Sequence, residues 1–268
     1  MTRTDLMDMI QATPFMIYGN GYIARRLYKC IKSLDAAARP LGFVVTNAKN
    51  GETGPDGTPV TSIREAKNTD VTLFVAAHDT VADEMQKTAR RYGFQNVVWI
   101  YPWLWQIELG EPIERNRLVS TKKLAAEQQF YNLAIDYLSI AHILEGREHE
   151  IYVKMQSAWS TRAVAEKRLE RFKSRIADAA CHGFHEQTAV KLNEKNELLD
   201  GMHSVALALF FGATAIHADI YPATRSFYDG VGIYRRGVLM KEDLPTYYSV
   251  HEIREIETVH KEIRGLSS

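Results

Sequence analysis

Cysteine is scarce in this chain. Among its 268 residues there are two, Cys30 and Cys181, which lie far apart and outside any CxxC pair. This usage excludes a disulfide scaffold and a cysteine-rich zinc module. We therefore expect reduced thiols and a cytoplasmic protein.

Net charge is absent as well, because 33 Lys and Arg residues balance 33 Asp and Glu residues. A neutral chain lacks the general electrostatic attraction to nucleic acids and anionic membranes, so neither is an expected partner.

Long apolar runs are also missing. The longest, residues 205–211, is much shorter than the ~20 residues of a membrane helix. Residues 1–11 are charged and mixed, unlike a signal peptide.

Proline is rare after residue 112, and this divides the chain. Six of the eight prolines lie at or before Pro112, and the stretch from 113 to 221 has only four glycines as breakers, which favours helices. The first hundred residues contain four short apolar runs with helical patterns between them, which predicts βαβ units and a parallel sheet. The strands are expected at residues 15–18, 42–46, 71–76 and 97–101, with helices at 23–34 and 81–92.

The sequence of the second half predicts both helices and short strands. Apolar residues spaced by three and four predict helices over residues 120–145 and 162–182. Short strands are expected at 188–192, 197–199 and 215–221, with a helix at 205–211 between the last two. Ser249 and Glu252 form a capping box that predicts a C-terminal helix. The predicted domains are residues 1–112 and residues 113–268.

A glycine motif follows the first expected strand. Gly19-Asn20-Gly21 leads through two residues to Ala24, a G-x-G-x-x-A pattern that allows close approach of a phosphate to the start of a helix. The carboxylate that normally holds the ribose is missing, since Asn47 follows the second strand. Three interpretations remain: a turn without a ligand, a nucleotide or sugar-nucleotide site, and an NAD(P) site.

The same region resembles the small Rossmann-like modules found beside bacterial surface-polysaccharide enzymes. The resemblance covers roughly residues 14–101 and rests on the glycine motif, a GFV strand at residues 42–44 and a GTPV turn at residues 57–60. It implies a small-molecule binding or sensing module and names no catalytic residue.

A second turn carries more chemistry. Asp200-Gly201-Met202-His203-Ser204 follows an expected strand and precedes an apolar helix. The backbone N–H groups of residues 201–204 would line an anion site. Asp200 could hold Mg²⁺ or act as a base, and His203 could donate to a phosphate or shuttle a proton. The alternative is an ordinary Asp-Gly turn with a capping His.

The surrounding stretch resembles the ParB/sulfiredoxin-like fold, whose members include chromosome-partition proteins, sulfiredoxin and free-serine kinases. The matching residues are Gly183, Gln187, a strand at 188–192, the D-G-x-H turn, Gly212 and the strand at 215–221, with Y-x-K-M-Q at residues 152–156 upstream. The closest likeness is to the domains encoded with capsule and lipopolysaccharide genes. The resemblance implies nucleotide phosphates at the turn.

This chain departs from that pattern in two ways. Ser204 stands where the family has an Arg that typically contacts phosphate. The catalytic Cys of sulfiredoxin is absent, which argues against sulfinic acid repair. The neutral chain also lacks the basic helix-turn-helix module that DNA binding of the ParB type requires.

Further candidates surround this turn. The resemblance favours Glu186 as a general base, because the kinases of the family use a carboxylate from this side. His182 and His185 beside it could hold a metal or merely line the loop. The helix at 162–175 is strongly basic, which indicates a solvated face with Glu partners or a charge that replaces the missing Arg. An aromatic cluster at Trp99, Trp103 and Trp105 indicates packing between domains or a homodimer patch.

We therefore expect an α/β protein with a Rossmann-like parallel-sheet domain, a helical linker and a ParB/sulfiredoxin-like α+β domain. The expected function is an ATP-dependent, small-molecule kinase in bacterial surface-polysaccharide metabolism, with ATP and Mg²⁺ as cofactors. The alternatives are a non-catalytic nucleotide- or sugar-nucleotide-binding protein and a sugar-nucleotide oxidoreductase. The expected catalytic residues are Asp200, His203 and Glu186, and the expected cofactor contacts are Gly201, Met202, Ser204, Gly19, Asn20 and Gly21, with Asp200 also on the metal.

Overall fold

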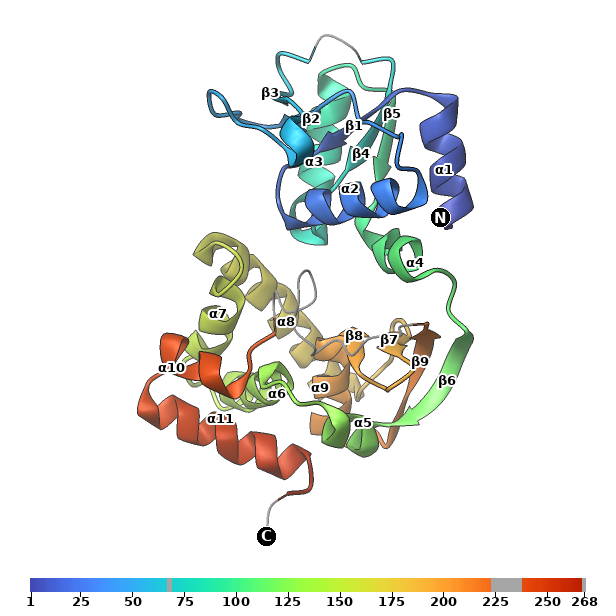
Figure 1. Ribbon diagram of the computed structural model, residues 1–268. Helices are drawn as coiled ribbons and strands as arrows, with labels where there is room; N and C mark the ends of the chain where they lie inside the picture. The colour runs from blue at the N-terminus through green and yellow to red at the C-terminus, as the bar shows by residue number, and fades with distance from the viewer. Residues whose placement is uncertain (67–68, 223–237, 267–268) are drawn as a thin grey trace. The chain divides into compact units, whose positions relative to one another are not determined.

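A computed structural model describes residues 1–66, 69–222 and 238–266 of the chain. They form two compact units, Met1–Glu111 and Pro112–Ser268, each with its own sheet (Figure 1). Each unit is described by itself.

Unit 1 has a five-stranded parallel sheet in the order β3-β2-β1-β4-β5. The predicted α/β class with a parallel sheet is confirmed here. Its strands are β1 (Phe15–Tyr18), β2 (Phe43–Val45), β3 (Val60–Ser62), β4 (Thr72–Val75) and β5 (Asn96–Trp99). Strand β3 was not predicted, since only Val60 of its three residues is apolar. The strand order reverses between β1 and β4, the position where parallel sheets commonly bind ligands.

Helices cover both faces of this sheet. One buried cluster joins β1 to α1 (Arg3–Ala12), α2 (Tyr22–Leu34) and α4 (Leu104–Leu109). The other joins the alternate strand residues to α3 (Asp79–Arg91). Two short 3-10 helices, Pro55–Gly57 and Tyr101–Trp103, lie in the connections. Because both faces are covered, the strands read as continuous apolar runs.

Unit 2 has a four-stranded mixed sheet in the order β6-β9-β7-β8. Its strands are β6 (Glu114–Ser120), β7 (Val190–Asn193), β8 (Leu198–Asp200) and β9 (Ala215–Tyr221). Strand β9 runs parallel to β7 and antiparallel to β6, and β8 runs antiparallel to β7. The edge strand β6 was not predicted.

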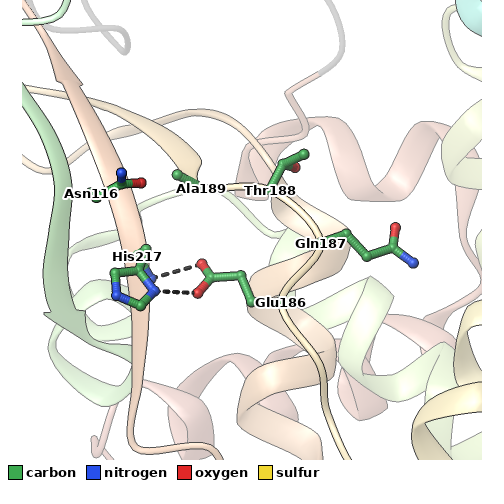
Figure 2. A pocket seen from close by; sticks show the side chains of 6 residues that line it. All are labelled: Asn116, Glu186, Gln187, Thr188, Ala189 and His217. Carbon is green, nitrogen blue, oxygen red and sulfur yellow. Dashed lines mark hydrogen bonds and ion pairs between the residues drawn. The ribbon is translucent and has the colours of Figure 1, made fainter.

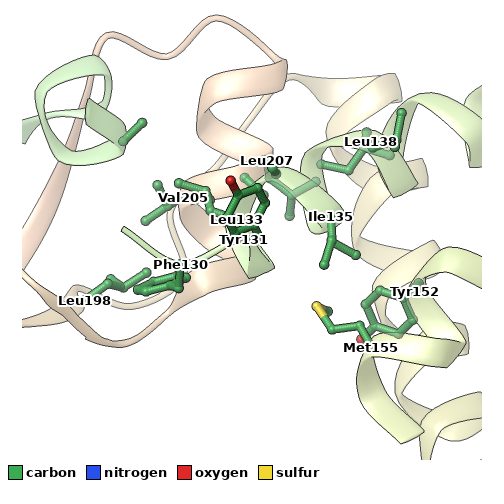
Figure 3. Packing of buried hydrophobic residues seen from close by; sticks show 14 of the residues in the cluster. Phe130, Tyr131, Leu133, Ile135, Leu138, Tyr152, Met155, Leu198, Val205 and Leu207 are labelled. Carbon is green, nitrogen blue, oxygen red and sulfur yellow. The ribbon is translucent and has the colours of Figure 1, made fainter. Parts of the chain in front are cut away.

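The helices of unit 2 form the rest of its core. They are α5 (Thr121–Glu127), α6 (Asn132–Leu144), α7 (Glu150–Ser157), α8 (Arg162–His182), α9 (Met202–Phe210), α10 (Leu244–Tyr247) and α11 (Val250–Ile263), with a 3-10 turn at Lys241–Asp243. Helix α9 packs against β7 and β9, and α6 packs against α9. Figure 3 shows Leu133 of α6 beside Leu207 of α9, with Tyr152 of α7 in the same cluster.

The single helix predicted over residues 120–145 is wrong. Ser120 ends β6 and caps α5, and the chain is extended at Gln128 before α6 begins. The Gln128 side chain donates to the carbonyl of Asn196 and accepts from the N–H of Leu198, which ties the break to β8. Tertiary hydrogen bonds therefore interrupt an apolar spacing that would otherwise continue as one helix.

The other predicted helices of unit 2 are present. Helix α8 spans the predicted residues, and Ser249 and Glu252 form the expected capping box of α11. Helix α9 begins at Met202, three residues before the prediction, so His203 and Ser204 lie in its first turn. Among the described residues, no helix is long and apolar enough to cross a membrane.

Candidate functional site

The turn before α9 has the shape that an anion site requires. Gly201 has a φ of +100°, and a Cβ at this position would lie 2.6 Å from Cγ1 of Val190. Only glycine fits, so the chain reverses tightly between β8 and α9. The N–H groups of Ser204 and Val205 bond to the carbonyl of Gly201, whereas the N–H of Met202 has no hydrogen-bond partner among the described residues. The start of α9 therefore presents the N–H of Met202 and the positive end of the helix dipole. Two of the four predicted donors are already bonded, because the N–H of Gly201 donates to Oδ1 of Asp200 and that of Ser204 donates to the carbonyl of Gly201.

Arg175 of α8 lies against this first turn. Its Nη2 donates to Oγ of Ser204 at 2.9 Å. Burial lowers the pKa of the Arg175 guanidinium, and the nearby Asp136 opposes this shift. The guanidinium of arginine is not deprotonated in proteins, so the group stays cationic. The predicted basic helix thus brings one guanidinium to the first turn of α9.

Three more basic residues of α8 have partners other than Ser204. Arg162 pairs with Glu150 and Glu166, and Lys173 pairs with Glu170. Arg168 donates to Oε1 of Gln156. These contacts match the interpretation of a solvated face for most of the helix, with Arg175 as the exception.

His203 is held by aromatic side chains. Its ring stacks on Phe172 of α8 with a centroid distance of 4.4 Å. Nε2 lies 3.1 Å from the hydroxyl of Tyr152 and 3.6 Å from Oδ2 of Asp136. The imidazole side chain is 32% exposed, which leaves part of it accessible from solvent.

Asp136 of α6 is the group that the sequence analysis missed. The residue is 1% exposed, and both carboxylate oxygens lack a hydrogen bond within the described part of the chain. Burial raises the pKa of this carboxyl well above its ordinary value, and the charge of Arg175 opposes the rise. No sequence signal marked it, because its neighbours are the apolar residues of a buried helix.

Asp200 has a different environment from His203. Its Oδ2 accepts from Nζ of Lys191 at 2.9 Å, and its Oδ1 accepts from the N–H of Gly201. Asp200 pairs with Lys191 across β8 and β7, and Lys191 pairs with Asp219 across β7 and β9. The neighbours Val190, Leu192 and Ala218 are buried, so this polar row lies on the sheet face away from the core.

Glu186, the third predicted catalytic residue, lines a surface cavity that is widely open to solvent. The cavity has a volume of about 370 Å³ and is lined by Asn116, Glu186, Gln187, Thr188, Ala189 and His217. Figure 2 shows Glu186 facing His217 of β9. One carboxylate oxygen accepts from the N–H of His217 at 2.7 Å, and the other lies 2.6 Å from Nδ1. The carboxylate therefore fixes the orientation of the imidazole.

Two cavity residues were also missed by the sequence analysis. His217 is exposed between the buried Ile216 and Ala218, so alternation along β9 was the available signal. Asn116 has a φ of +53° where the pairing of β6 with β9 shifts in register. A bulge of this kind aims a side chain differently from its neighbours and has no clear mark in sequence.

The two other histidines next to Glu186 have local partners. Nδ1 of His182 lies 3.0 Å from Asp178 one helical turn away, and Nε2 of His185 lies 2.9 Å from the carbonyl of His182. Within the described residues, no three His, Cys, Asp or Glu side chains converge as metal ligands. The contacts favour the interpretation that these histidines line the loop.

The glycine motif of unit 1 makes a turn at the carboxyl end of β1. Gly19 has a φ of +122°, and a Cβ there would lie 3.0 Å from the carbonyl oxygen of Ala76. Gly21 precedes α2 and has open space around it. The Asn20 amide donates to Glu52 at 2.9 Å and, at 3.4 Å, to the carbonyl of Thr53. A carboxylate does lie beside the glycines, but Glu52 comes from the loop after β2.

The three tryptophans of unit 1 do not share one environment. Nε1 of Trp99 donates to the carbonyl of Ala77, and the guanidinium of Arg26 lies 3.9 Å from the Trp105 ring centroid. Trp103 is 41% exposed. Two of the three therefore have partners within unit 1.

No protein-family model matches the sequence, and no curated protein or solved structure matches it either.

Proposed function

We propose that unit 2 binds the phosphates of ATP at the start of α9 and transfers the terminal phosphoryl group to a hydroxyl of a small molecule, within bacterial surface-polysaccharide metabolism. The contact between Arg175 and Ser204 is the observation that carries this proposal. It brings a cationic guanidinium to a helix N-terminus at which the N–H of Met202 has no hydrogen-bond partner within the described part of the chain. Backbone donors, a helix dipole and a guanidinium are the groups that bind phosphates in proteins.

The cavity beside β7 is the proposed acceptor site. Ala189 lines it, and the next residue, Val190, packs on Gly201 of the phosphate turn. The cavity and the phosphate turn are thus adjacent along the chain, because Ala189 of the cavity is bonded directly to Val190, which contacts Gly201 of the turn. Its lining offers an amide, a hydroxyl, a carboxylate and an imidazole, a set that suits a compound with several hydroxyl groups.

In the reaction, the acceptor oxygen forms a bond to the γ-phosphorus, and the bond between this phosphorus and the bridging oxygen breaks, which releases ADP. The acceptor proton passes to the pair of Glu186 and His217, whose hydrogen bonds already orient both groups. Arg175, the N–H of Met202 and the dipole of α9 stabilise the charge on the phosphate oxygens.

A divalent cation fits Asp200 in part. The Asp200 side chain is 44% exposed, and the carboxylate already accepts from Lys191. Magnesium sites at nucleotides commonly use one or two carboxylates with substrate phosphates and waters. Bound there with ATP, Mg²⁺ would neutralise phosphate charge, and Asp200 is the residue that would hold it.

A second candidate function concerns unit 1. Glu52 hydrogen-bonds to Asn20 within the glycine motif, and this bond lowers the pKa of the Glu52 carboxyl. An ionised carboxylate beside the glycine turn could bind the ribose hydroxyls of a nucleotide or sugar-nucleotide. This observation supports the two alternative functions, a nucleotide- or sugar-nucleotide-binding protein and a sugar-nucleotide oxidoreductase.

Labelled ATP with a panel of hydroxy amino acids and sugars tests the proposal, alongside calorimetry with ATP. We expect ATP binding and a labelled phosphoester product. Glu186→Gln should retain ATP binding and lose turnover, while Glu194→Gln, a control at an exposed position of the same unit, should retain both. ATP binding without any product would favour the non-catalytic alternative, and absence of ATP binding would refute the proposed site.

A further inference from the structure

The strongest unexplained feature of unit 2 is the buried carboxyl of Asp136. The residue is 1% exposed, and neither oxygen makes a hydrogen bond within the described residues. An ionised carboxylate without donors is very unfavourable in a protein interior. Burial accordingly raises the pKa of Asp136, and the free protein should hold it as the neutral acid at neutral pH.

Groups from several helices face this carboxyl. His203 of α9 places Nε2 3.6 Å from Oδ2. Arg175 of α8 attracts the ionised form. Tyr152 of α7 places its hydroxyl 3.1 Å from the same Nε2, and Tyr248, which precedes α11, interacts unfavourably with the Asp136 charge. Asp136 is therefore aimed at the first turn of α9, where the phosphates are proposed to bind.

We propose that the pair of Asp136 and His203 carries one proton, which lies on the carboxyl when the site is empty, and that a phosphate bound at the start of α9 moves this proton to the imidazole. The inference rests on the proposed nucleotide site. The O–H bond of Asp136 breaks and an N–H bond forms at Nε2 of His203, so the protein neither takes up nor releases a proton.

Electrostatics gives the direction of the transfer. With the site empty, burial favours the neutral acid beside a neutral imidazole. Phosphate brings negative charge to the first turn of α9, which stabilises an imidazolium in that turn. The carboxylate left on Asp136 then becomes the counter-ion of His203 and Arg175. In this arrangement, Asp136 is a positioning residue that makes His203 cationic only when phosphate is present.

Infrared difference spectroscopy of the full chain, with and without ATP, tests this transfer. A protonated carboxyl without hydrogen bonds has a C=O stretch separated from the amide and carboxylate bands. We expect the free wild type to show this band and ATP to abolish it. Asp136→Asn is nearly isosteric and should lack the band in both states. Ser139→Ala, a control at another buried polar position of α6, should behave as the wild type does.

His203→Gln separates proton transfer from a structural effect, because glutamine can donate a hydrogen bond but cannot take the proton. This variant should bind ATP and keep the carboxyl band. A band that persists in the ATP-saturated wild type, or that is absent from the free wild type, would overturn the inference and leave the proposed function intact. Failure of the wild type to bind ATP would refute both.

Discussion

Arg175 and Ser204 lie 29 residues apart in sequence, yet the guanidinium donates to the Ser204 hydroxyl at 2.9 Å. The guanidinium comes from α8 and reaches a side chain in the first turn of α9. This contact lies at the N-terminal end of α9, where the positive end of the helix dipole is located.

Moving the positive charge from position 175 to position 204 tests whether this charge contributes to phosphate binding. Arg175→Ala should weaken ATP binding about tenfold to hundredfold, because a charge-assisted hydrogen bond contributes roughly 1.5–3 kcal/mol. Ser204→Arg alone should also weaken binding, since two guanidinium groups would then crowd one position. The double variant Arg175→Ala/Ser204→Arg should recover part of the loss. Isothermal calorimetry with ATP measures all three.

Arg171→Ala is the matched control, since it removes an exposed Arg from the same helix. We expect its ATP affinity to remain within about twofold of the wild type, the small effect typical of an exposed charge. Equal losses for Arg171→Ala and Arg175→Ala would mean that the helix attracts ATP by its general charge. No loss for Arg175→Ala would contradict a phosphate contact.

The sequence predicted the fold best where local signals and tertiary contacts agree. Four strands of unit 1, β1, β2, β4 and β5, lie in apolar runs bounded by turn residues, and α8 ends at Gly183, so their positions could be predicted. The break at Gln128 could not, because it depends on hydrogen bonds to Asn196 and Leu198, about 70 residues away in sequence.

Only the residues of the candidate site that lie in the turn before α9 or just before β7 could be predicted from the sequence. Glu186, Gly201 and His203 lie in recognisable motifs. Asp136 is one polar residue within a buried helix, and Glu52 lies in a surface loop with no regular spacing from the glycines. Residues that reach a site from distant segments leave no local pattern, because folding alone brings them together.

Gly201 should not tolerate a side chain. Gly201→Ala places an alanine in the left-handed region and its Cβ 2.6 Å from Cγ1 of Val190. We expect a loss of about 2–4 kcal/mol in the free energy of unfolding, from backbone strain and the steric clash together. Denaturant unfolding measures it. In a Val190→Ala background the same substitution should cost less, and equal costs in both backgrounds would show that the clash is relieved by other movements.

The two glycines of the unit 1 motif should respond differently to substitution. Gly19→Ala meets the carbonyl of Ala76 at 3.0 Å with a φ of +122°, so it should destabilise unit 1 by about 1–3 kcal/mol. Gly21→Val has open space and should cost about 1 kcal/mol or less.

Gly21→Val should nevertheless abolish binding of any nucleotide whose phosphate approaches that backbone. Calorimetry of the wild type and Gly21→Val with NAD⁺, NADP⁺, CTP and UDP-sugars measures this. Retained affinity in the variant would place the ligand away from Gly21. Binding of none of them by the wild type would leave the glycines as turn residues.

Asp136→Asn should increase the free energy of unfolding at neutral pH, and this gain over the wild type should grow as the pH rises. The folded-state pKa of Asp136 is raised by burial, whereas the unfolded chain has the ordinary value of about 3.9. Between these two values the unfolded state loses its proton while the folded state keeps it, so wild-type stability falls as pH rises through this window. Asparagine does not titrate and avoids this loss. We expect a gain of about 1–3 kcal/mol near neutral pH, the scale of one buried group without a partner, and little difference below about pH 4.

Urea unfolding of the wild type and Asp136→Asn across this pH range, with Ser139→Ala as the control, measures the effect. A variant that is less stable than the wild type at neutral pH would show that Asp136 is ionised in the folded protein and that its attraction to Arg175 and His203 exceeds the cost of burial.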